Sequence, residues 1–242
     1  MSKMKNEKRT LTNKKYWKQC IQAIVVLLIY FFLPLLQPVP FYLFGIDLKT
    51  VPITIKAIYL IVFEALMIVL MISVFYEDLK EKFEDLKKNH RAYFNEYIKY
   101  WFLILLLMMI SNSIIMGLNN GAMASNEETI RENFTIVPLY TFFSAVVFAP
   151  IVEELTFRKS IRNICTNDFI FIFLSGLIFG SLHVLPSYQT PMDLLYLIPY
   201  SIPGWVFAYT LKKSKNIFVP MGLHFLHNGI LMSLQAFLYF FM

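Results

Sequence analysis

The feature that most constrains this chain is a series of long apolar segments separated by short clusters of charged residues. Of the 242 residues, 57% are hydrophobic and 16% are charged, whereas an ordinary soluble domain carries about 25% charged residues. A helix needs about 20 mainly apolar residues to cross a bilayer. The pattern therefore predicts an all-α fold, a polytopic bundle of about seven transmembrane helices, or eight with a partial or re-entrant one.

The apolar segments leave no soluble stretch long enough for a second hydrophobic core. We therefore predict one transmembrane domain over residues 17–242, preceded by a basic cytoplasmic tail at 1–16. Residues 77–99 carry a dense run of charge and predict either an amphipathic helix on the membrane surface or a solvated helical linker. The predicted spans cover residues 16–36, 56–76, 100–118, 135–162, 168–185, 193–211 and 216–242.

The basic residues predict the orientation of these spans. The net charge is +6, and lysine and arginine occur in the tail and in the connections at 77–99, 158–168 and 212–215. Cytoplasmic loops of membrane proteins are enriched in both residues, so the N-terminus is predicted to be cytoplasmic. Membrane topology and anionic lipid explain the positive charge better than nucleic-acid binding does. A composition rich in lysine, isoleucine, asparagine and phenylalanine indicates a bacterial plasma membrane protein.

Glutamate side chains occur inside two of the predicted spans, where ionisable groups are costly and normally face a protein interior or a water-filled cavity. The fourth span contains Glu153, Glu154 and Arg158. Because Arg158 follows Glu154 by four positions, both lie on one helical face, and we expect an ion pair that leaves Glu153 freer to act on water. Glu64 in the second span has two interpretations, a cavity-lining acid or a structural acid that shares a hydrogen bond.

Two later spans contain histidine and asparagine at similar depths. At 1.5 Å per residue, Glu153 lies roughly 13 Å and His183 roughly 22 Å from the predicted inner helix ends, and His224 and Asn228 lie roughly 12 and 18 Å from them. We expect these groups to converge in one buried pocket, with a tilted or kinked helix bringing His183 to Glu153. A carboxylate and an imidazole can deprotonate water, and hydrogen-bond donors can stabilise an oxyanion. The pattern therefore predicts hydrolysis.

Three short motifs on separate predicted spans carry these residues. They are Glu153-Glu154-x-x-x-Arg158, Phe179-x-x-x-His183 and His224-x-x-x-Asn228. In order and character they resemble the motifs of the CPBP family, the CAAX-protease and bacteriocin-processing intramembrane endopeptidases, also called the Abi family. The resemblance covers about residues 136–232.

The resemblance implies an intramembrane endopeptidase in which Glu153 and His183 activate water, while His224 and Asn228 stabilise the oxyanion. It assigns a supporting role to Glu154 and Arg158. Phe179 precedes His183 by four positions, so it packs on the same helical face and shapes the pocket. His227 does not match the third motif and is interpreted as a structural or indirectly supporting residue.

The family was long labelled a group of metalloproteases, and later views favour a glutamate-dependent mechanism without an essential metal. The chain has no His-Glu-x-x-His, the helical zinc signature. Glu153, His183 and His224 would nevertheless be an acceptable zinc ligand set with one open position. We therefore expect no required cofactor and keep zinc as the alternative. Cys20 and Cys165 lie far apart in sequence and indicate neither a disulfide framework nor a metal cluster.

The expected substrates are membrane-associated peptides or proteins, either a bacteriocin or pheromone precursor or the C-terminal segment of a CAAX-type lipidated protein. Two further functions compete with proteolysis. One is bacteriocin self-immunity or scaffolding, in which the chain acts only by binding a partner. The other is transport or proton relay through Glu64, Glu153 and Glu154, against which the lack of a repeated, interrupted helix pair argues.

Overall fold

The structure, a computed structural model, describes residues 14–241, and all regular secondary structure within that range is helical. Most of the basic tail predicted at residues 1–16 lies outside the described range. By length and composition, six described helices can cross a membrane, so the chain is a polytopic helical membrane protein. They cover Lys14–Leu43, Ile53–Val74, Tyr76–Leu118, Pro138–Ile164, Asp168–Ser187 and Pro191–Ser214.

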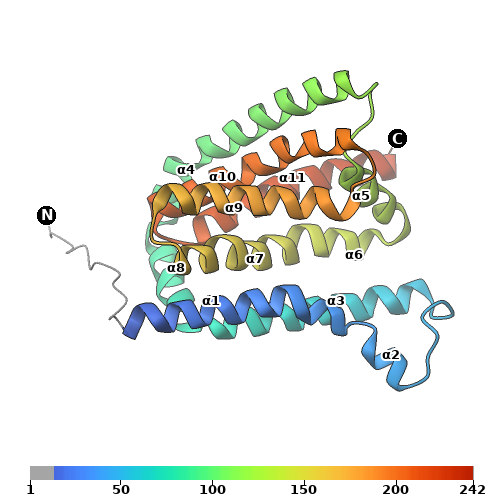
Figure 1. Ribbon diagram of the computed structural model, residues 1–242, viewed down its shortest axis with the longest axis horizontal. Coiled ribbons are helices and arrows are strands. Elements are labelled where there is room, and N and C mark those ends of the chain that lie inside the picture. The colour runs from blue at the N-terminus through green and yellow to red at the C-terminus, as the bar shows by residue number, and fades with distance from the viewer. Residues whose placement is uncertain (1–13, 242) are drawn as a thin grey trace, which may run out of the picture.

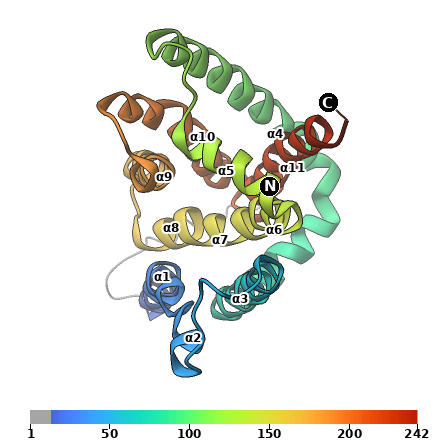
Figure 2. The same ribbon diagram turned by 90° about the vertical axis from the view of Figure 1, so that its right-hand side faces the viewer.

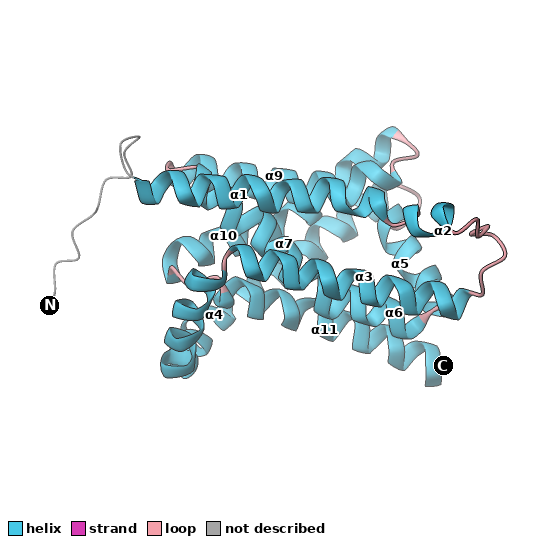
Figure 3. Cartoon of the chain, turned by 90° about the horizontal axis from the view of Figure 1, so that it is seen from below, coloured by secondary structure: helices cyan, strands magenta, loops and turns pink. Residues whose placement is uncertain are grey.

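Two N-terminal helices form one side of the bundle. The helices α1 (Lys14–Phe32) and α3 (Ile53–Val74) lie side by side along this face (Figures 1 and 3). Between them, a 3₁₀ turn, η1 (Leu33–Leu36), and the short helix α2 (Val39–Leu43) follow the prolines that end the first span. The side-chain amide of Gln22 donates to the carbonyl of Val74 at 2.6 Å and links the middle of α1 to the C-terminal end of α3.

The charged run at residues 77–99 is not a separate element. It forms the first half of α4 (Tyr76–Leu118), a single helix of 43 residues that also contains the third predicted span. Such a helix is roughly 65 Å long, about twice the thickness of the hydrocarbon core. Its first part crosses one end of the bundle and its last part runs along the side (Figures 1 and 2). The charged half therefore covers the end of the bundle where α1 begins.

The fourth span lies between the α1–α3 face and the remaining helices (Figures 1 and 2). A short helix, α5 (Ser125–Ile136), occupies most of the polar connection that precedes it. The span is one helical run whose α-helical pieces alternate with two π-helical ones, η2 and η3. In order they are α6 (Pro138–Phe143), η2 (Ser144–Phe148), α7 (Ala149–Glu153), η3 (Glu154–Ser160) and α8 (Ile161–Ile164).

The main core cluster joins this central span to the α1–α3 face. Side chains that are at most 2% exposed meet there from α1, α3 and the fourth span, among them Val26, Met67, Met71, Val152 and Leu155. Many other large apolar side chains are exposed on the outer surfaces of the helices. An exposed apolar exterior is what a bundle surrounded by lipid requires.

Helices α9 (Asp168–Val184) and α10 (Leu197–Ser214) pack against each other at glycines, and η5 (Pro191–Tyr196) leads into α10. A Cβ atom on Gly204 would lie 2.7 Å from the Cα of Gly176, closer than real Cβ atoms approach. A Cβ on Gly180 would overlap Ser201. Small residues in membrane helices permit this close approach of two backbones. The glycines therefore fix the position of α9, which carries His183.

The last helix, α11 (Phe218–Phe241), has 24 residues and packs against α10 and α4. It corresponds to the seventh predicted span but is not among the six apolar spans. Its apolar sequence is interrupted by polar residues, including His224, His227 and Asn228, which lower its mean hydropathy. Six spans are thus supported by length and composition, and the seventh remains a prediction.

Candidate active site

A cavity of about 720 Å³ lies among α4, α5, the fourth span and α9 to α11. All four predicted catalytic residues line this cavity together with Phe179, so three helices bring them to one place. The cavity is long, because its lining on α11 runs from His224 to Leu238. Residues at different depths, such as Glu153 and His183, can therefore line the same cavity. We expected a tilted or kinked helix to carry His183, and α9 is a continuous helix through Val184. The lining residues from the three motifs are Glu153, Phe179, His183, His224 and Asn228.

Behind the cavity wall lies a sealed ionic cluster made by Glu154, Arg158 and His224. Glu154 and Arg158 are fully buried, and Arg158 Nη1 lies 3.3 Å from Glu154 Oε1. The predicted pairing of Arg158 with Glu154 is therefore confirmed. The guanidinium carbon lies 4.3 Å from the ring centre of Phe179 and 5.3 Å from that of Phe207, distances at which the ring faces attract a cation.

His224 connects this cluster to the cavity. Its Nδ1 lies 3.0 Å from Glu154 Oε1. Because an ionised carboxylate only accepts hydrogen bonds, Nδ1 carries a hydrogen, and Nε2 is left facing Glu153, whose Oε2 is 3.9 Å away. That separation exceeds a direct hydrogen bond. The sequence did not indicate the contact between His224 and Glu154, which are 70 positions apart.

Glu153 has a different environment from its neighbour Glu154. Its side chain is 14% exposed and lines the cavity. Its Oε2 is buried and has no hydrogen-bond partner among residues 14–241. Buried polar atoms are rarely left unpaired, and each such atom calls for an explanation. This oxygen is closed off from the cavity and lies 3.9 Å from His224 Nε2, so it is the exposed remainder of the side chain that borders the cavity.

His183 is held on two sides. Its Nδ1 lies 2.9 Å from the carbonyl oxygen of Phe179, and since a carbonyl only accepts, Nδ1 carries the hydrogen. Nε2 of the neutral ring is then free to accept. The imidazole stacks on Tyr200 with ring centres 5.2 Å apart, while Phe207 stacks on His224 at 5.0 Å. Tyr200 and Phe207 are seven positions apart on α10, a two-turn spacing that sequence reasoning did not single out.

Asn228 is positioned by a backbone carbonyl that the fourth span leaves free. In a regular helix, the carbonyl of Ala145 would accept from the N–H of Ala149, but that N–H bonds to Ser144 instead. The next residue is Pro150, which has no N–H to donate. Asn228 Nδ2 donates to the Ala145 carbonyl at 2.8 Å. The amide nitrogen has two hydrogens, so one remains for a ligand.

Two further buried residues lie near the cavity. Glu64 accepts hydrogen bonds from the hydroxyls of Tyr140 at 3.0 Å and Ser144 at 2.9 Å. Both donors line the cavity and Glu64 does not, which matches the interpretation of a structural acid that shares a hydrogen bond. His227 lines the cavity, and its Nδ1 has no hydrogen-bond partner within the described range. Its exclusion from the catalytic set stays a prediction.

The alternative zinc ligand set was Glu153, His183 and His224. Across residues 14–241, no group of three or more histidine, cysteine, aspartate and glutamate side chains is arranged to hold a metal ion. These three side chains line one cavity but do not form such a group. Cys20 and Cys165 are both free thiols.

Comparison with known proteins identifies the region that contains the cavity. The profile described as "Type II CAAX prenyl endopeptidase Rce1-like" matches residues 135–230. Over these residues, the chain is similar to the Rce1-like CAAX endopeptidase family. This Rce1-like region contains every residue of the three motifs and nearly coincides with the predicted catalytic core at 136–232.

Curated relatives come from three bacteria. YdiL of Bacillus subtilis (strain 168) is 32% identical over 48% of this chain and 45% of its own length. The UPF0177 protein YvdC of Lactococcus lactis (strain IL1403) is 25% identical over 52% of this chain and 47% of its own. The chain thus spans about half the length of these two relatives. The membrane-embedded CAAX protease MroQ of Staphylococcus aureus (strain USA300) is 24% identical over 91% of this chain and 90% of its own. No solved structure matches the chain.

Proposed function

We propose that this protein is an intramembrane endopeptidase that hydrolyses peptide bonds of membrane-associated peptides or lipidated proteins. The observation that carries the proposal is the shared cavity, which Glu153, His183 and Asn228 all line. The match of the Rce1-like family to the same residues supports this chemistry. The relative MroQ, which aligns over nearly the whole chain, is named a CAAX protease.

In the proposed reaction, Glu153 is the base. Its carboxylate takes one proton from a water molecule, and the resulting hydroxide attacks the carbonyl carbon of the scissile peptide bond. His183 orients this water, because its Nδ1–H is held by the Phe179 carbonyl and its Nε2 accepts the second water hydrogen. Glu153 then passes its proton to the leaving nitrogen, so that the products are a carboxylic acid and an amine.

The charge that develops on the carbonyl oxygen needs donors that are already in place. Asn228 supplies one from the amide hydrogen that is not bonded to Ala145. His224 supplies the other hydrogen-bond donor, Nε2–H, when both ring nitrogens carry a hydrogen. Glu154 holds His224 in this orientation through Nδ1, and Arg158 stabilises Glu154 as a carboxylate. Phe179 shapes the pocket by packing against His183 and Arg158.

We propose that this reaction requires no metal, since the carboxylate and two imidazoles supply the base and the donors. The substrate class is a peptide that reaches a cavity within the span region. It is either a bacteriocin or pheromone precursor or the C-terminal segment of a CAAX-type protein. The large share of apolar lining residues, such as Leu105, Met109 and Leu231, suits an apolar or lipidated segment.

The proposal is tested with purified protein in detergent. Wild type and Glu153→Gln are incubated with a pool of prenylated CAAX peptides and bacteriocin-type precursor peptides, with and without a chelator, and products are read by mass spectrometry. Glu132→Gln is the matched control, because Glu132 is an exposed residue of α5 that does not line the cavity. We expect a product from wild type and the control, with and without chelator, and none from Glu153→Gln.

Each departure from this result has a defined meaning. Undiminished cleavage by Glu153→Gln would exclude Glu153 as the base. Loss of the wild-type product with chelator would contradict the metal-free mechanism and restore zinc. The absence of any product from folded wild-type protein would count against proteolysis and favour a role in binding.

A further inference from the structure

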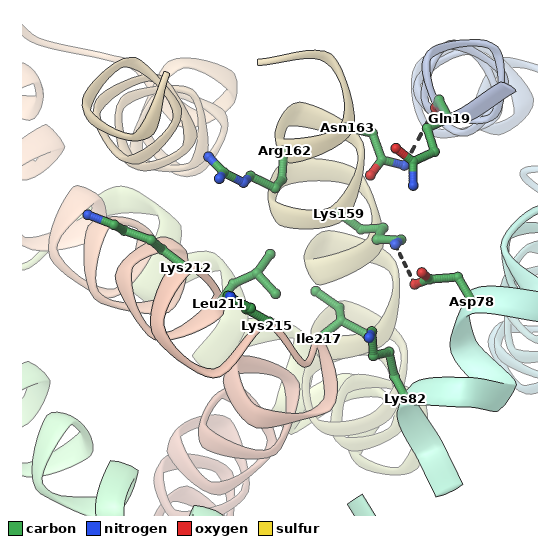
Figure 4. A pocket seen from close by; sticks show the side chains of 10 residues that line it. All are labelled: Gln19, Asp78, Lys82, Lys159, Arg162, Asn163, Leu211, Lys212, Lys215 and Ile217. Carbon is green, nitrogen blue, oxygen red and sulfur yellow. Dashed lines mark hydrogen bonds and ion pairs between the residues drawn. The ribbon is translucent and has the colours of Figure 1, made fainter. Parts of the chain in front are cut away.

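A second pocket, of about 310 Å³, lies at the end of the bundle where α1 begins and α10 ends (Figure 4). Its walls come from α1, α4, the inner end of the fourth span, α10 and the turn between α10 and α11. The polar lining is mainly cationic. The cationic side chains are Lys82, Lys159, Arg162, Lys212 and Lys215.

The carboxylates at this pocket do not balance the five cations. Asp78 forms an ion pair with Lys159. Asp168 lies between two others, with Oδ1 2.7 Å from Arg162 Nη1 and Oδ2 3.3 Å from Lys212 Nζ. With Glu81, which pairs with Lys82, three carboxylates face five positive charges, and the pocket keeps an excess of positive charge.

Lys82 and Lys215 are the cations of this pocket with the weakest pairing. Lys82 pairs at 3.0 Å with its sequence neighbour Glu81, whose side chain is 75% exposed, and exposed pairs of this kind contribute little. Within residues 14–241, no carboxylate forms an ion pair with Lys215. Figure 4 shows both lysines at the edge of the pocket formed by α4 and the α10–α11 turn.

The two walls that carry these lysines are joined by a buried asparagine. Asn216 is fully buried, and its Nδ2 donates at 2.9 Å to both the carbonyl of Lys82 and Oδ2 of Asp85. Its Oδ1 accepts from the N–H of Phe218 at 3.0 Å. Asn216 thus holds the α10–α11 turn, which carries Lys215, against the part of α4 that carries Lys82.

We propose that this pocket binds the phosphate group of an anionic membrane lipid, with Lys82 and Lys215 as its main contacts. Lysine and arginine are the side chains that recognise phosphate, and basic pockets between membrane helices bind lipid headgroups. The pocket lies where α1 begins and α10 ends, and we place the headgroup region at these ends of the spans. Apolar side chains next to it are exposed for acyl chains, with Ile21 60% and Phe169 77% accessible. Inorganic phosphate offers the same anionic group to the lysines but has no acyl chains.

The test measures lipid binding by native mass spectrometry of the full protein in a neutral detergent. Wild type is titrated with phosphatidylglycerol, with zwitterionic phosphatidylcholine, and with inorganic phosphate. The same titrations are made on Lys82→Gln/Lys215→Gln and on Lys80→Gln/Lys88→Gln. The second variant removes two charges from exposed positions of the same helix α4 that do not line the pocket. Lys82→Arg/Lys215→Arg is included as the charge-conserving variant.

We expect phosphatidylglycerol to bind wild type and the Lys80/Lys88 control more tightly than phosphatidylcholine does. Each pocket lysine removed should weaken binding roughly fivefold, so the double variant should lose on the order of 25-fold, and the arginine variant should retain binding. Equal binding of the two lipids by wild type would overturn the proposal without any variant. Equal losses in the pocket and control variants would also overturn it. Inorganic phosphate that binds as tightly as phosphatidylglycerol would contradict a lipid source.

Discussion

Glu153 and Glu154 are adjacent in the sequence, yet they belong to two regions with opposite properties. Glu153 lines the cavity, and its side chain is 14% exposed. Glu154 is sealed behind the cavity wall between Arg158 and His224. Successive residues of a helix point about 100° apart. A step of one residue therefore places Glu153 at the cavity and Glu154 in the core. This difference in position leaves Glu153 available for chemistry, whereas Glu154 fixes the geometry of the site.

The largest effect on stability is expected from breaking the sealed cluster. Arg158→Met should lower the free energy of unfolding by about 3–5 kcal/mol, because it leaves the fully buried Glu154 without its cationic partner. The double variant Glu154→Gln/Arg158→Met should recover much of this loss, since neither charge then remains buried alone. Denaturant unfolding in detergent measures both. A single variant as stable as wild type would show that the cluster does not hold the fold.

A smaller effect is expected where α9 is fixed against α10. Gly204→Ala should cost about 1–3 kcal/mol, because its new Cβ would meet the backbone of Gly176 and push apart the helices that carry His183 and Phe207. Gly222→Ala on α11 is the matched control, since nothing lies within 4 Å of a Cβ there. Thermal unfolding compares the two. If both variants unfold at the same temperature, close packing at Gly204 does not position the cavity wall.

The smallest effect is expected at Glu64, a buried acid held by neutral donors instead of a cation. Tyr140→Phe removes the 3.0 Å hydrogen bond to Glu64 and should cost about 1 kcal/mol. Tyr42→Phe should change nothing measurable, because Tyr42 is 74% exposed. Chemical denaturation of both variants measures how much the hydrogen bond to Glu64 contributes to the free energy of unfolding. This value is then compared with that of the sealed cluster. If Tyr140→Phe loses as much stability as Arg158→Met, then a buried acid held by neutral donors is as important for stability as one paired with a cation.

The sequence predicted the fold most closely where one apolar segment forms one helix. The spans predicted at 56–76 and 168–185 correspond to α3 and α9 within a few residues. The continuity of α4 was not predicted, because charged residues favour a helix on a surface and do not show whether it joins the next span. The seventh span was predicted from length, whereas the polar residues of α11 lower its hydropathy.

The candidate site was predictable only in part. The four-residue spacing showed that Arg158 pairs with Glu154, because neighbours on one helix are set by periodicity. The contact of His224 with Glu154 and the stacking of Tyr200 on His183 depend on packing between helices, which a single sequence does not encode locally. Pro150 offered only part of a signal, since a proline in an α-helix frees the carbonyl four residues before it, and the π-helical register shifts the free carbonyl to Ala145, which holds Asn228.

The measurement that tests the division between the two acids most directly is the rate of peptide cleavage per mole of folded protein in Glu153→Gln and Glu154→Gln. Both changes keep the shape of the side chain and remove one charge. We expect Glu153→Gln to fold as wild type does and to lose cleavage by about 10²- to 10⁴-fold, the usual contribution of a general base. Glu154→Gln should be less stable, with the folded fraction keeping measurable activity. Equal losses of stability and cleavage in the two variants would contradict the division.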